Sequence, residues 1–539
     1  MYAMSQKTNQ TQNIPRRYLY SLQEQIHELQ SEIEAIVNEQ GVQSNNIGST
    51  TPIQRNSTEE YHVGVTGTAF GNLPCATTYI GPLTSARLLE RLLIALAERH
   101  LASTADMDET DSPCRQALQS LSELRSHNKG TTAMSHIFID PKKPDTQIQS
   151  STQRALIEHY LKVVQPEYPL LSLGQEVEFL NEENPVRRWG SDTSASDGLA
   201  INSVFAIGAT LLARDQEPAL TTVALAFTRN VRKASQSVVD LENTQLEAVK
   251  HLVTAFSFSA LCELTQPASG QAYAVLGRAF SLMEQLRAEY QTSLYPLDDE
   301  FKRLEYCLMK MESVVEIHFQ RPSRYTAISS LSSFDDAGAS RLDYSSIAAY
   351  KQIRISRQYL NNNHVPSQRI LDDLVPTRHR LAPQGLEKVL DFVTATVYLA
   401  LHPLFTTCPE IIFLYSSKQQ HTICLDKPTT DLLYVVSRSA ARVIDHYVQA
   451  NKDSKIISLW IAAEHILQAG AMWATYLIMV HTQSLGGGLS GIGLSTAMTP
   501  LHKCTSLLSS IAQRWGDGTN YTEVWDTFLL LYWDTLTEL

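Results

Sequence analysis

From Thr152 to the end of the chain, apolar residues recur at helical spacing, and this pattern constrains the fold more than any other feature. The sustained apolar–polar alternation of a half-buried strand is absent from this region, and no repeat of fixed period is visible. We therefore expect one large, irregular all-α domain that fills residues 152–539. Nearly all of this region is predicted to be helical, and examples of the predicted helices are residues 154–164, 200–213, 246–262, 270–289, 299–319, 386–400, 431–450, 458–480 and 499–515.

Composition narrows the class of protein. The seven cysteines are odd in number and widely scattered, which predicts a reducing compartment and not a disulfide framework. The formal net charge is −12, and basic residues occur as isolated pairs, so the chain does not resemble a protein that coats nucleic acid by itself. We interpret Arg232–Lys233 and Lys302–Arg303 as solvated surface pairs.

The most apolar stretch covers residues 458–480, where Glu464, His465 and Gln468 interrupt it. The uninterrupted remainder is shorter than the roughly 20 residues that a membrane span requires. We interpret the stretch as a buried helix, with His465 as a hydrogen-bonded core histidine. The N-terminus has no apolar core behind basic residues, so it does not look like a signal peptide, and we expect no membrane association.

Residues 16–40, RRYLYSLQEQIHELQSEIEAIVNEQ, predict a short coiled-coil helix. Their apolar residues are spaced alternately three and four positions apart, which is the heptad pattern. Mostly β-branched residues at position a, with Leu at two of the three d positions, favour two parallel strands. The alternative is an amphipathic helix that lies on its own globular domain. The predicted dimerisation residues are Leu19, Leu22, Ile26, Leu29, Ile33 and Ile36.

The remaining N-terminal region divides by composition. Residues 1–15 are polar and predicted to be disordered, and residues 41–84 read as a linker with short strands or turns. Residues 85–151 contain helical segments and an acidic loop, Asp106–Asp111. That loop lacks the Gly turn and distal Glu of a calcium loop, so we interpret it as solvated surface.

Motifs of known catalytic chemistry are absent: there is no H-E-x-x-H, no Walker A loop and no nucleophile elbow. GGGLSG at residues 486–491 matches G-x-G-x-x-G, but it follows a helical pattern instead of a strand, so a flexible interhelical loop is the better interpretation. Cys408, His421 and Cys424 are scattered ligand types that make a poor zinc site.

The acidic residues Glu305, Glu312 and Glu316 lie on or near one face of a predicted helix, with Lys302 and Arg303 nearby. This arrangement suggests ordinary surface ion pairs. Nothing in the sequence converges on a nucleophile, a base and an oxyanion donor. We predict no catalytic, metal-binding or DNA-binding residue in this chain, and no enzyme activity.

Several segments together resemble the fungal-specific transcription factor domain, the helical regulatory region of zinc-cluster transcription factors. LIEHYLKVVQPEYPLL, at residues 156–171, resembles its opening, and QAYAVLGRAFSLMEQL, at residues 271–286, resembles a later helix. Further similar segments are residues 78–89, 201–213, 298–325, 392–405 and 501–528. The resemblance implies structural roles for Gly277, as a close-packing position, and for Arg321, Pro322 and Trp515. Where the family usually has Trp and an Asp-Arg pair, this chain has Tyr306 and Glu316.

In such factors, a basic module with two zinc ions and six cysteines precedes a linker and a short coiled coil. The stretch from Ile14 to Ile36 resembles that linker and coil, yet the first cysteine is Cys75. The resemblance therefore implies that the zinc ligands and the DNA-reading module are missing here. Two explanations stay open: an incomplete product of a DNA-binding regulator, or a regulator that forms mixed dimers.

We expect a nuclear, non-enzymatic regulator of genes read by RNA polymerase II, in secondary metabolism or another pathway. Its expected partners are a homodimer or heterodimer through the coiled coil, the transcription machinery, a small-molecule effector, and DNA only through the missing module or a partner. No cofactor is expected. The alternative is an α-helical enzyme or small-molecule carrier with an interhelical cavity, which titratable groups converging in one large pocket would favour.

Overall fold

The computed structural model confirms the all-α class, because the residues that it describes form helices and short connections with no strand among them. They include two groups of long helices, the first built around two central helices and the second around one. The described residues are 89, 91–96, 99, 149–171, 176, 195–237, 246–265, 272–293, 299–319, 392, 395–396, 398–402, 405, 411, 415, 427–483, 494–515 and 518–538.

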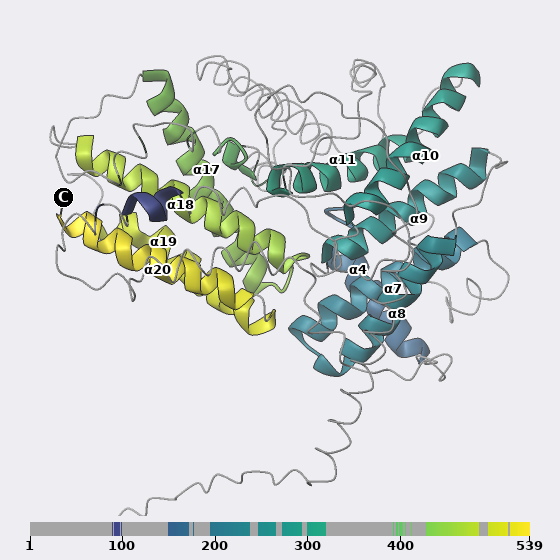
Figure 1. The fold of residues 1–539 in the computed structure, drawn as a ribbon. Helices are drawn as coiled ribbons and strands as arrows, with labels where there is room; N and C mark the ends of the chain where they lie inside the picture. The colour runs from purple at the N-terminus through teal and green to yellow at the C-terminus, as the bar shows by residue number, and fades with distance from the viewer. Residues whose placement is uncertain are drawn as a thin grey trace, which may run out of the picture. The chain divides into compact units, whose positions relative to one another are not determined.

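The first helix group, drawn from blue to teal in Figure 1, is built around α7 and α9. Helix α7 packs against α4, α8 and α9, and α9 also packs against α10 and α11. Both central helices are apolar on nearly all sides, as a helix with neighbours all round must be. The group comprises α4 (Ser150–Val163), α7 (Ala195–Asp215), the 3₁₀ helix η2 (Pro218–Leu220), α8 (Thr221–Ser237), α9 (Leu246–Thr265), α10 (Ala272–Ser293) and α11 (Asp299–Phe319).

The second helix group, drawn from green to yellow in Figure 1, is built around α18. It comprises α17 (Lys427–Lys452), α18 (Leu459–Gln483), α19 (Leu494–Arg514) and α20 (Gly518–Glu538). Helix α18 packs against the other three, which accounts for the apolar stretch in the sequence. Among the described helices, none is long and apolar enough to cross a membrane.

Glycines set the closest helix contacts in both groups. A Cβ added to Gly208 in α7 would lie 2.5 Å from the backbone oxygen of Leu156 in α4. A Cβ added to Gly470 in α18 would collide with the Trp525 ring of α20. At both positions a neighbouring helix therefore occupies the space that any larger residue would need.

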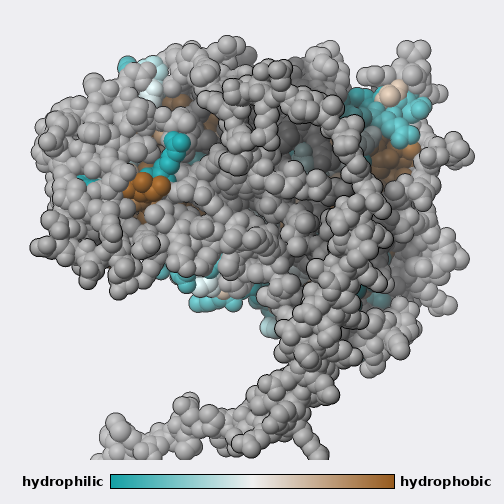
Figure 2. All heavy atoms as spheres, in the orientation of Figure 1, coloured by the Kyte–Doolittle hydropathy of each residue, from teal (hydrophilic) through white to brown (hydrophobic). Residues whose placement is uncertain are grey.

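The outer helix α10 exposes polar side chains to solvent. Figure 2 shows hydrophilic side chains gathered at the upper right, over the part of the molecule where Figure 1 places α9 and α10. The exposed residues of α10 include Glu284 and Glu289, while Leu286 between them is fully buried. Helix α10 is thus amphipathic, with its apolar face toward α9 and α11.

Most predicted helices are confirmed, with differences at their ends. Helix α11 has the predicted bounds, whereas α19 begins at Leu494, five residues before the predicted start at Thr499. The prediction placed Pro500 in the first turn, where proline is best tolerated. In the structure the helix continues on both sides of Pro500. Helix α8 lies in the region where the sequence predicts helix almost throughout, and it agrees with that prediction.

The prediction of a solvated acidic face on α11 is wrong. Glu305 and Glu312 are each only 2% exposed. Glu305 is bound by the guanidinium of Arg287 from α10, because α11 packs against α10 and α9 on this side. Arg303 is also wrongly predicted as a surface residue, since its side chain is 13% exposed.

Several sequence predictions lie outside the described residues. They are the six dimerisation residues of the predicted coiled coil (Leu19, Leu22, Ile26, Leu29, Ile33 and Ile36), the strands or turns before residue 84, the acidic and glycine-rich loops, and Arg321 and Pro322. These stay predictions. Of the helix predicted near residues 85–101, the described Leu89, Leu92, Leu93 and Leu96 are helical and buried, as expected.

Candidate functional site

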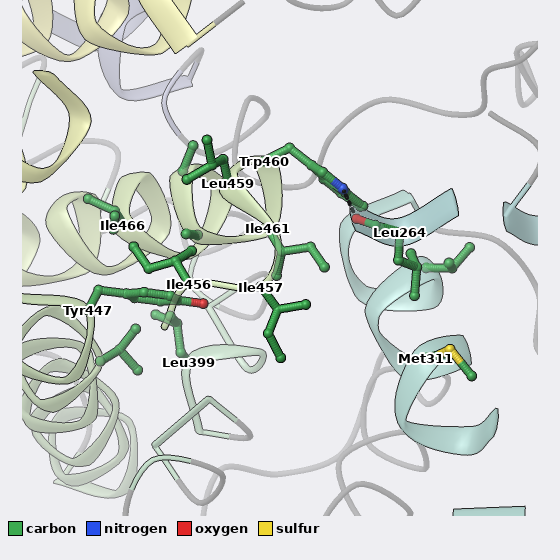
Figure 3. Packing of buried hydrophobic residues seen from close by; sticks show 14 of the residues in the cluster. Leu264, Met311, Leu399, Tyr447, Ile456, Ile457, Leu459, Trp460, Ile461 and Ile466 are labelled. Atoms are coloured by element: carbon green, nitrogen blue, oxygen red, sulfur yellow. Dashed lines mark hydrogen bonds between the residues drawn. The ribbon is translucent and has the colours of Figure 1, made fainter. Parts of the chain in front are cut away.

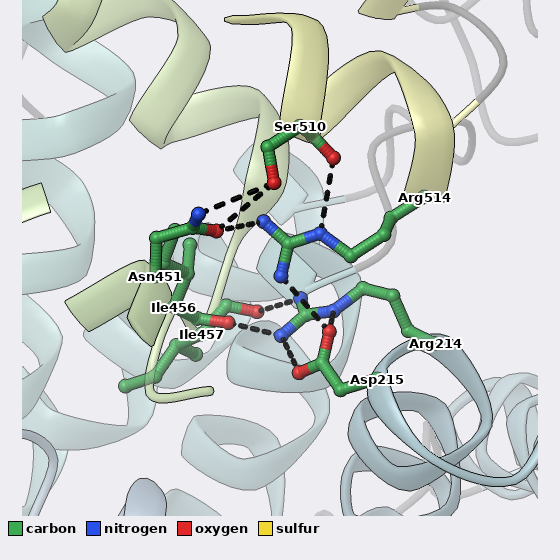
Figure 4. Close-up of polar contacts among 7 residues, drawn as sticks. All are labelled: Arg214, Asp215, Asn451, Ile456, Ile457, Ser510 and Arg514. Carbon is green, nitrogen blue, oxygen red and sulfur yellow. Dashed lines mark hydrogen bonds and ion pairs between the residues drawn. The ribbon is translucent and has the colours of Figure 1, made fainter. Parts of the chain in front are cut away.

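The first helix group contacts the second at a junction in which polar and titratable side chains from distant segments converge. At one end of this junction, α7 finishes with Arg214 and Asp215. The guanidinium of Arg214 binds the carboxylate of Asp215 side-on, with Nε to Oδ1 at 2.9 Å and Nη2 to Oδ2 at 2.7 Å. The same guanidinium donates to the backbone oxygens of Ile456 and Ile457 in the second group (Figure 4).

A second arginine completes this polar clamp from α19. Arg514 donates from Nη1 to Oδ1 of Asp215 at 3.1 Å, and from Nη2 to Oδ1 of Asn451. The Asp215 side chain is only 1% exposed, so two guanidinium groups share one buried carboxylate. Burial lowers the pKa of Arg514, and Asp215 opposes that effect. The clamp thus joins the ends of α7, α17 and α19.

The turn after α17 presents the carbonyl groups that Arg214 binds. Ser454 has a positive φ of 53°. The amide of Lys455 donates to the oxygen of Ala450 at 2.8 Å, and that of Ser454 to the oxygen of Asn451 at 3.3 Å. This pair of bonds is the Schellman motif, which normally places glycine at the left-handed position. The chain then turns directly into Ile456 and Ile457.

The indole of Trp460 links the two helix groups in the apolar part of the junction. Trp460, near the start of α18, donates from Nε1 to the backbone oxygen of Leu264 at 2.8 Å. Leu264 lies in the last turn of α9, where carbonyl groups have no amide partner within the helix. Figure 3 shows Ile457 and Ile461 reaching toward the first group beside this bond. Trp460 therefore caps one helix while it packs the other group against it.

A second polar cluster forms where Lys310 of α11 contacts Glu167 and Tyr168, in the segment that follows α4. Its Nζ donates to the backbone oxygen of Glu167 at 3.1 Å and lies 3.5 Å from that residue's carboxylate. The same ammonium lies 4.3 Å from the centre of the Tyr168 ring, a cation–π contact. Burial works to lower the pKa of Lys310, but Tyr168 and Glu167 outweigh it and raise the pKa, so the group stays charged.

His446 of the second helix group lies near Lys310 and Glu167. Burial lowers the pKa of His446, and the charges of Glu167 (raising) and Lys310 (lowering) also act on it. His446 stacks on Phe392 with ring centroids 3.6 Å apart. The next residue, Tyr447, shares a 2.7 Å hydrogen bond with Nδ1 of His465, which confirms His465 as a hydrogen-bonded core histidine.

Burial shifts the pKa of several titratable groups at the junction. Burial raises the pKa of Tyr168 and of Cys307 to about 12, and lowers the pKa of His465 to about 3. A general acid or base works best with a pKa near the ambient pH. Near neutral pH, Tyr168 and Cys307 keep their protons and His465 is the neutral imidazole, so these groups provide neither a thiolate nor an imidazolium.

Glu305 has a pKa near neutral pH, but its side chain is buried. Burial raises the pKa of its carboxyl to about 7, against the opposing effect of Arg287. The carboxyl group is nevertheless enclosed between α10 and α11 and bonded to Arg287. Burial between the two helices therefore accounts for the raised pKa.

The two implied structural residues that the structure describes are Gly277 and Trp515. Gly277 lies buried in α10, and Trp515 follows α19 and packs against Tyr521 of α20, with ring centroids 5.6 Å apart. Sequence reasoning missed the residues of the clamp. Asp215 and Arg514 are 299 positions apart, and neither belongs to a local pattern that would signal an interaction.

Within the described residues, no three or more His, Cys, Asp and Glu side chains are placed to hold a metal ion. In comparisons with known proteins, no protein-family model, no curated protein and no solved structure matches this chain.

Proposed function

We propose that this chain is a transcription regulator of the fungal zinc-cluster type, acting in the nucleus on genes read by RNA polymerase II. Residues 152–539 serve as its regulatory domain, and a pathway such as secondary metabolism is a suitable target. The observation that carries the proposal is the agreement in order between the resembling sequence segments and the described helices.

Five of the resembling segments from α4 onward coincide with described helices. Residues 156–171 cover most of α4 and the turn after it, where Leu170 and Leu171 are buried as the apolar pair of that motif. Residues 271–286 fall on α10, with Gly277 on its buried side. The other matches are residues 201–213 in α7, 298–319 in α11 and 501–528 across α19 and α20.

The chemistry of the junction supports a non-enzymatic role. Its tyrosine, cysteine and histidine side chains hold their uncharged forms near neutral pH, and its charged groups are engaged in contacts between helices. Such a junction transmits changes between two packed groups, because both groups contribute to the same contacts. That property suits a regulatory domain.

In this proposal the predicted coiled coil of residues 16–40 pairs two chains, and DNA is read by a zinc-cluster module or a partner. Replacing Ile26 and Leu29 by Asp should abolish self-association while the helical domain stays folded. A carboxylate buried in the seam costs several kcal/mol, more than about three heptads can offset. Sedimentation measures the outcome, and an unchanged dimer would contradict the role of this stretch.

The direct test is to tether the full chain to a reporter gene through a foreign DNA-binding domain. We expect a severalfold change in transcription relative to the DNA-binding domain alone. The same chain, purified without a fusion partner, should enrich no motif from a random DNA pool at physiological salt with zinc present. An unchanged reporter contradicts the regulator, and an enriched motif contradicts the need for another DNA reader.

The second candidate is an α-helical small-molecule carrier or enzyme. The observation in its favour is the convergence of Lys310, Tyr168, His446 and His465 at the junction between the helix groups. A carrier would bind its ligand at the junction yet leave the tethered reporter unchanged. The tethering experiment therefore separates the two candidates.

A further inference from the structure

Helix α20, drawn in yellow at the lower edge of the second helix group in Figure 1, has one face toward the interior and one toward solvent. On the interior face, the rings of Trp525, Phe528 and Tyr532 lie in contact, with centroids 5.5 and 5.8 Å apart. The hydroxyl of Tyr532 donates to the backbone oxygen of Ala474 in α18 at 3.2 Å. The indole of Trp525 donates to the hydroxyl of Thr505 in α19 at 3.0 Å. These bonds hold α20 in place, so the opposite face has a rigid support.

The outer face of α20 consists of Glu523, Asp526, Leu530 and Trp533. They are spaced three, four and three residues apart and therefore lie along one side of the helix. Leu530 is 54% exposed, the largest exposed fraction among the large apolar side chains that the structure describes. Leu529 and Trp533 are partly exposed. A single exposed leucine is ordinary on a protein surface, but here it extends a partly exposed apolar strip.

The charged residues of α20 all have the same sign. The helix contains Glu523, Asp526, Asp534 and Glu538, and it contains no Lys or Arg. Glu523 and Asp526 are exposed, and within the described part of the chain neither forms an ion pair. Burial raises the pKa of Asp526, and no neighbouring cation opposes that effect. The outer face therefore offers carboxylates beside an apolar strip, with no described cation to neutralise them.

The charge of the outer face restricts what can cover it. A second copy of the chain would set acidic residues against acidic residues, and the net charge of −12 adds to the repulsion. Nucleic acid and an anionic membrane surface are disfavoured for the same reason. Lys and Arg side chains fit this face, because their alkyl stems cover apolar surface while their charged ends reach the carboxylates. A convex helix face with an apolar strip is matched by the apolar face of a second helix.

We propose that the outer face of α20 binds a basic amphipathic helix of another protein. Apolar side chains of that helix pack on Leu530 and Trp533, and its Lys or Arg residues pair with Glu523 and Asp526. The contact buries apolar side chains and keeps the ion pairs at its edge, as is usual in protein interfaces. This proposal follows from the exposure and charge of α20 and does not rest on the proposed role in transcription.

The test uses the full chain and three synthetic peptides of about 18 residues, which is about five helical turns. The first peptide has Leu on one helix face and Lys on the other, the second has Glu in place of every Lys, and the third has Ala in place of every Leu. Fluorescence anisotropy at physiological salt measures the dissociation constant of each labelled peptide. We expect the first peptide to bind, the second not to bind, and the third to bind at least about tenfold more weakly than the first.

Variants of the chain place the binding on α20. Leu530→Ser and Asp526→Lys should each weaken binding of the first peptide at least about tenfold. Lys at both Glu523 and Asp526 should make the chain bind the second peptide, because the charges of the face are then reversed. The matched controls are Tyr434→Ser, at an exposed aromatic residue of α17, and Glu284→Lys, at an exposed acid of α10. Both controls should bind the first peptide as the wild type does.

Three outcomes overturn the proposal. The first is no binding of the first peptide, and the second is equal binding of the peptide that lacks Leu. The third is a loss of affinity in Glu284→Lys as large as that in Asp526→Lys, which would show attraction to the net charge alone. All the substituted positions are exposed, so the melting temperatures of the variants should match that of the wild type and exclude unfolding as the cause of lost binding. In that case Leu530→Ser with unchanged affinity also contradicts the proposal.

Discussion

Arg514 donates a hydrogen bond of 3.1 Å to Asp215, a residue 299 positions earlier in the chain, and Arg214 binds both oxygens of the same carboxylate. One acid with a 1% exposed side chain therefore holds the ends of α7 and α19 together. Removing one member of a buried ionic group is costly, because the remaining charges lose their counter-ion and cannot be solvated.

Asp215→Ala is expected to lower the free energy of unfolding by about 3–5 kcal/mol, since two buried guanidinium groups would lose their shared carboxylate. The matched control is Asp445→Ala, which removes the partner of Lys503 in a largely exposed ion pair. That control should cost less than about 1 kcal/mol. Urea unfolding measures both variants, and equal losses would show that the clamp stabilises no more than a surface pair.

Ser454→Gly is expected to stabilise the chain by about 1 kcal/mol, because glycine adopts a positive φ without the penalty that a side chain brings. The gain is reduced by the greater flexibility of glycine in the unfolded chain. Ser454→Val should have the opposite effect, since a β-branched residue fits the left-handed region poorly. Thermal unfolding of the two variants gives the test, and a Val variant as stable as the Gly variant would contradict the Schellman turn after α17.

Gly208→Ala is expected to destabilise the chain by about 1–3 kcal/mol through overpacking, although alanine is the better helix former. The new methyl group would lie 2.5 Å from the backbone oxygen of Leu156, and a helix backbone cannot give way as a flexible side chain can. Gly277→Ala on α10 tests the close-packing role that the family resemblance implies. Melting temperatures decide both cases, and a more stable Gly208 variant would show that α4 and α7 do not approach so closely.

The sequence predicts the class of fold and most helix positions because the outer helices carry an apolar periodicity and the central ones are long apolar stretches. Helix α11 shows the limit of that reasoning. Its apolar face is visible in the sequence, but Glu305 looks like a surface acid until Arg287 of another helix is placed beside it. The clamp shows the same limit at longer range, because Asp215 and Arg514 have ordinary local surroundings. Pairings between helices depend on packing that no single segment encodes.

The pH dependence of stability should reveal the lowered pKa of His465. Burial, together with His402 and His446, lowers its pKa from the ordinary 6.5 to about 3. Between these values the unfolded chain binds a proton at this position and the folded chain does not. The contribution of His465 to stability is therefore complete above pH 6.5 and is lost as the pH falls toward 3, by up to about 1.4 kcal/mol per pH unit. His465→Gln should lose that part of the acid sensitivity, whereas His502→Gln on the exposed side of α19 should keep it. Urea unfolding across this pH range measures the difference, and equal slopes for the wild type and His465→Gln would mean that His465 takes up a proton in the folded chain.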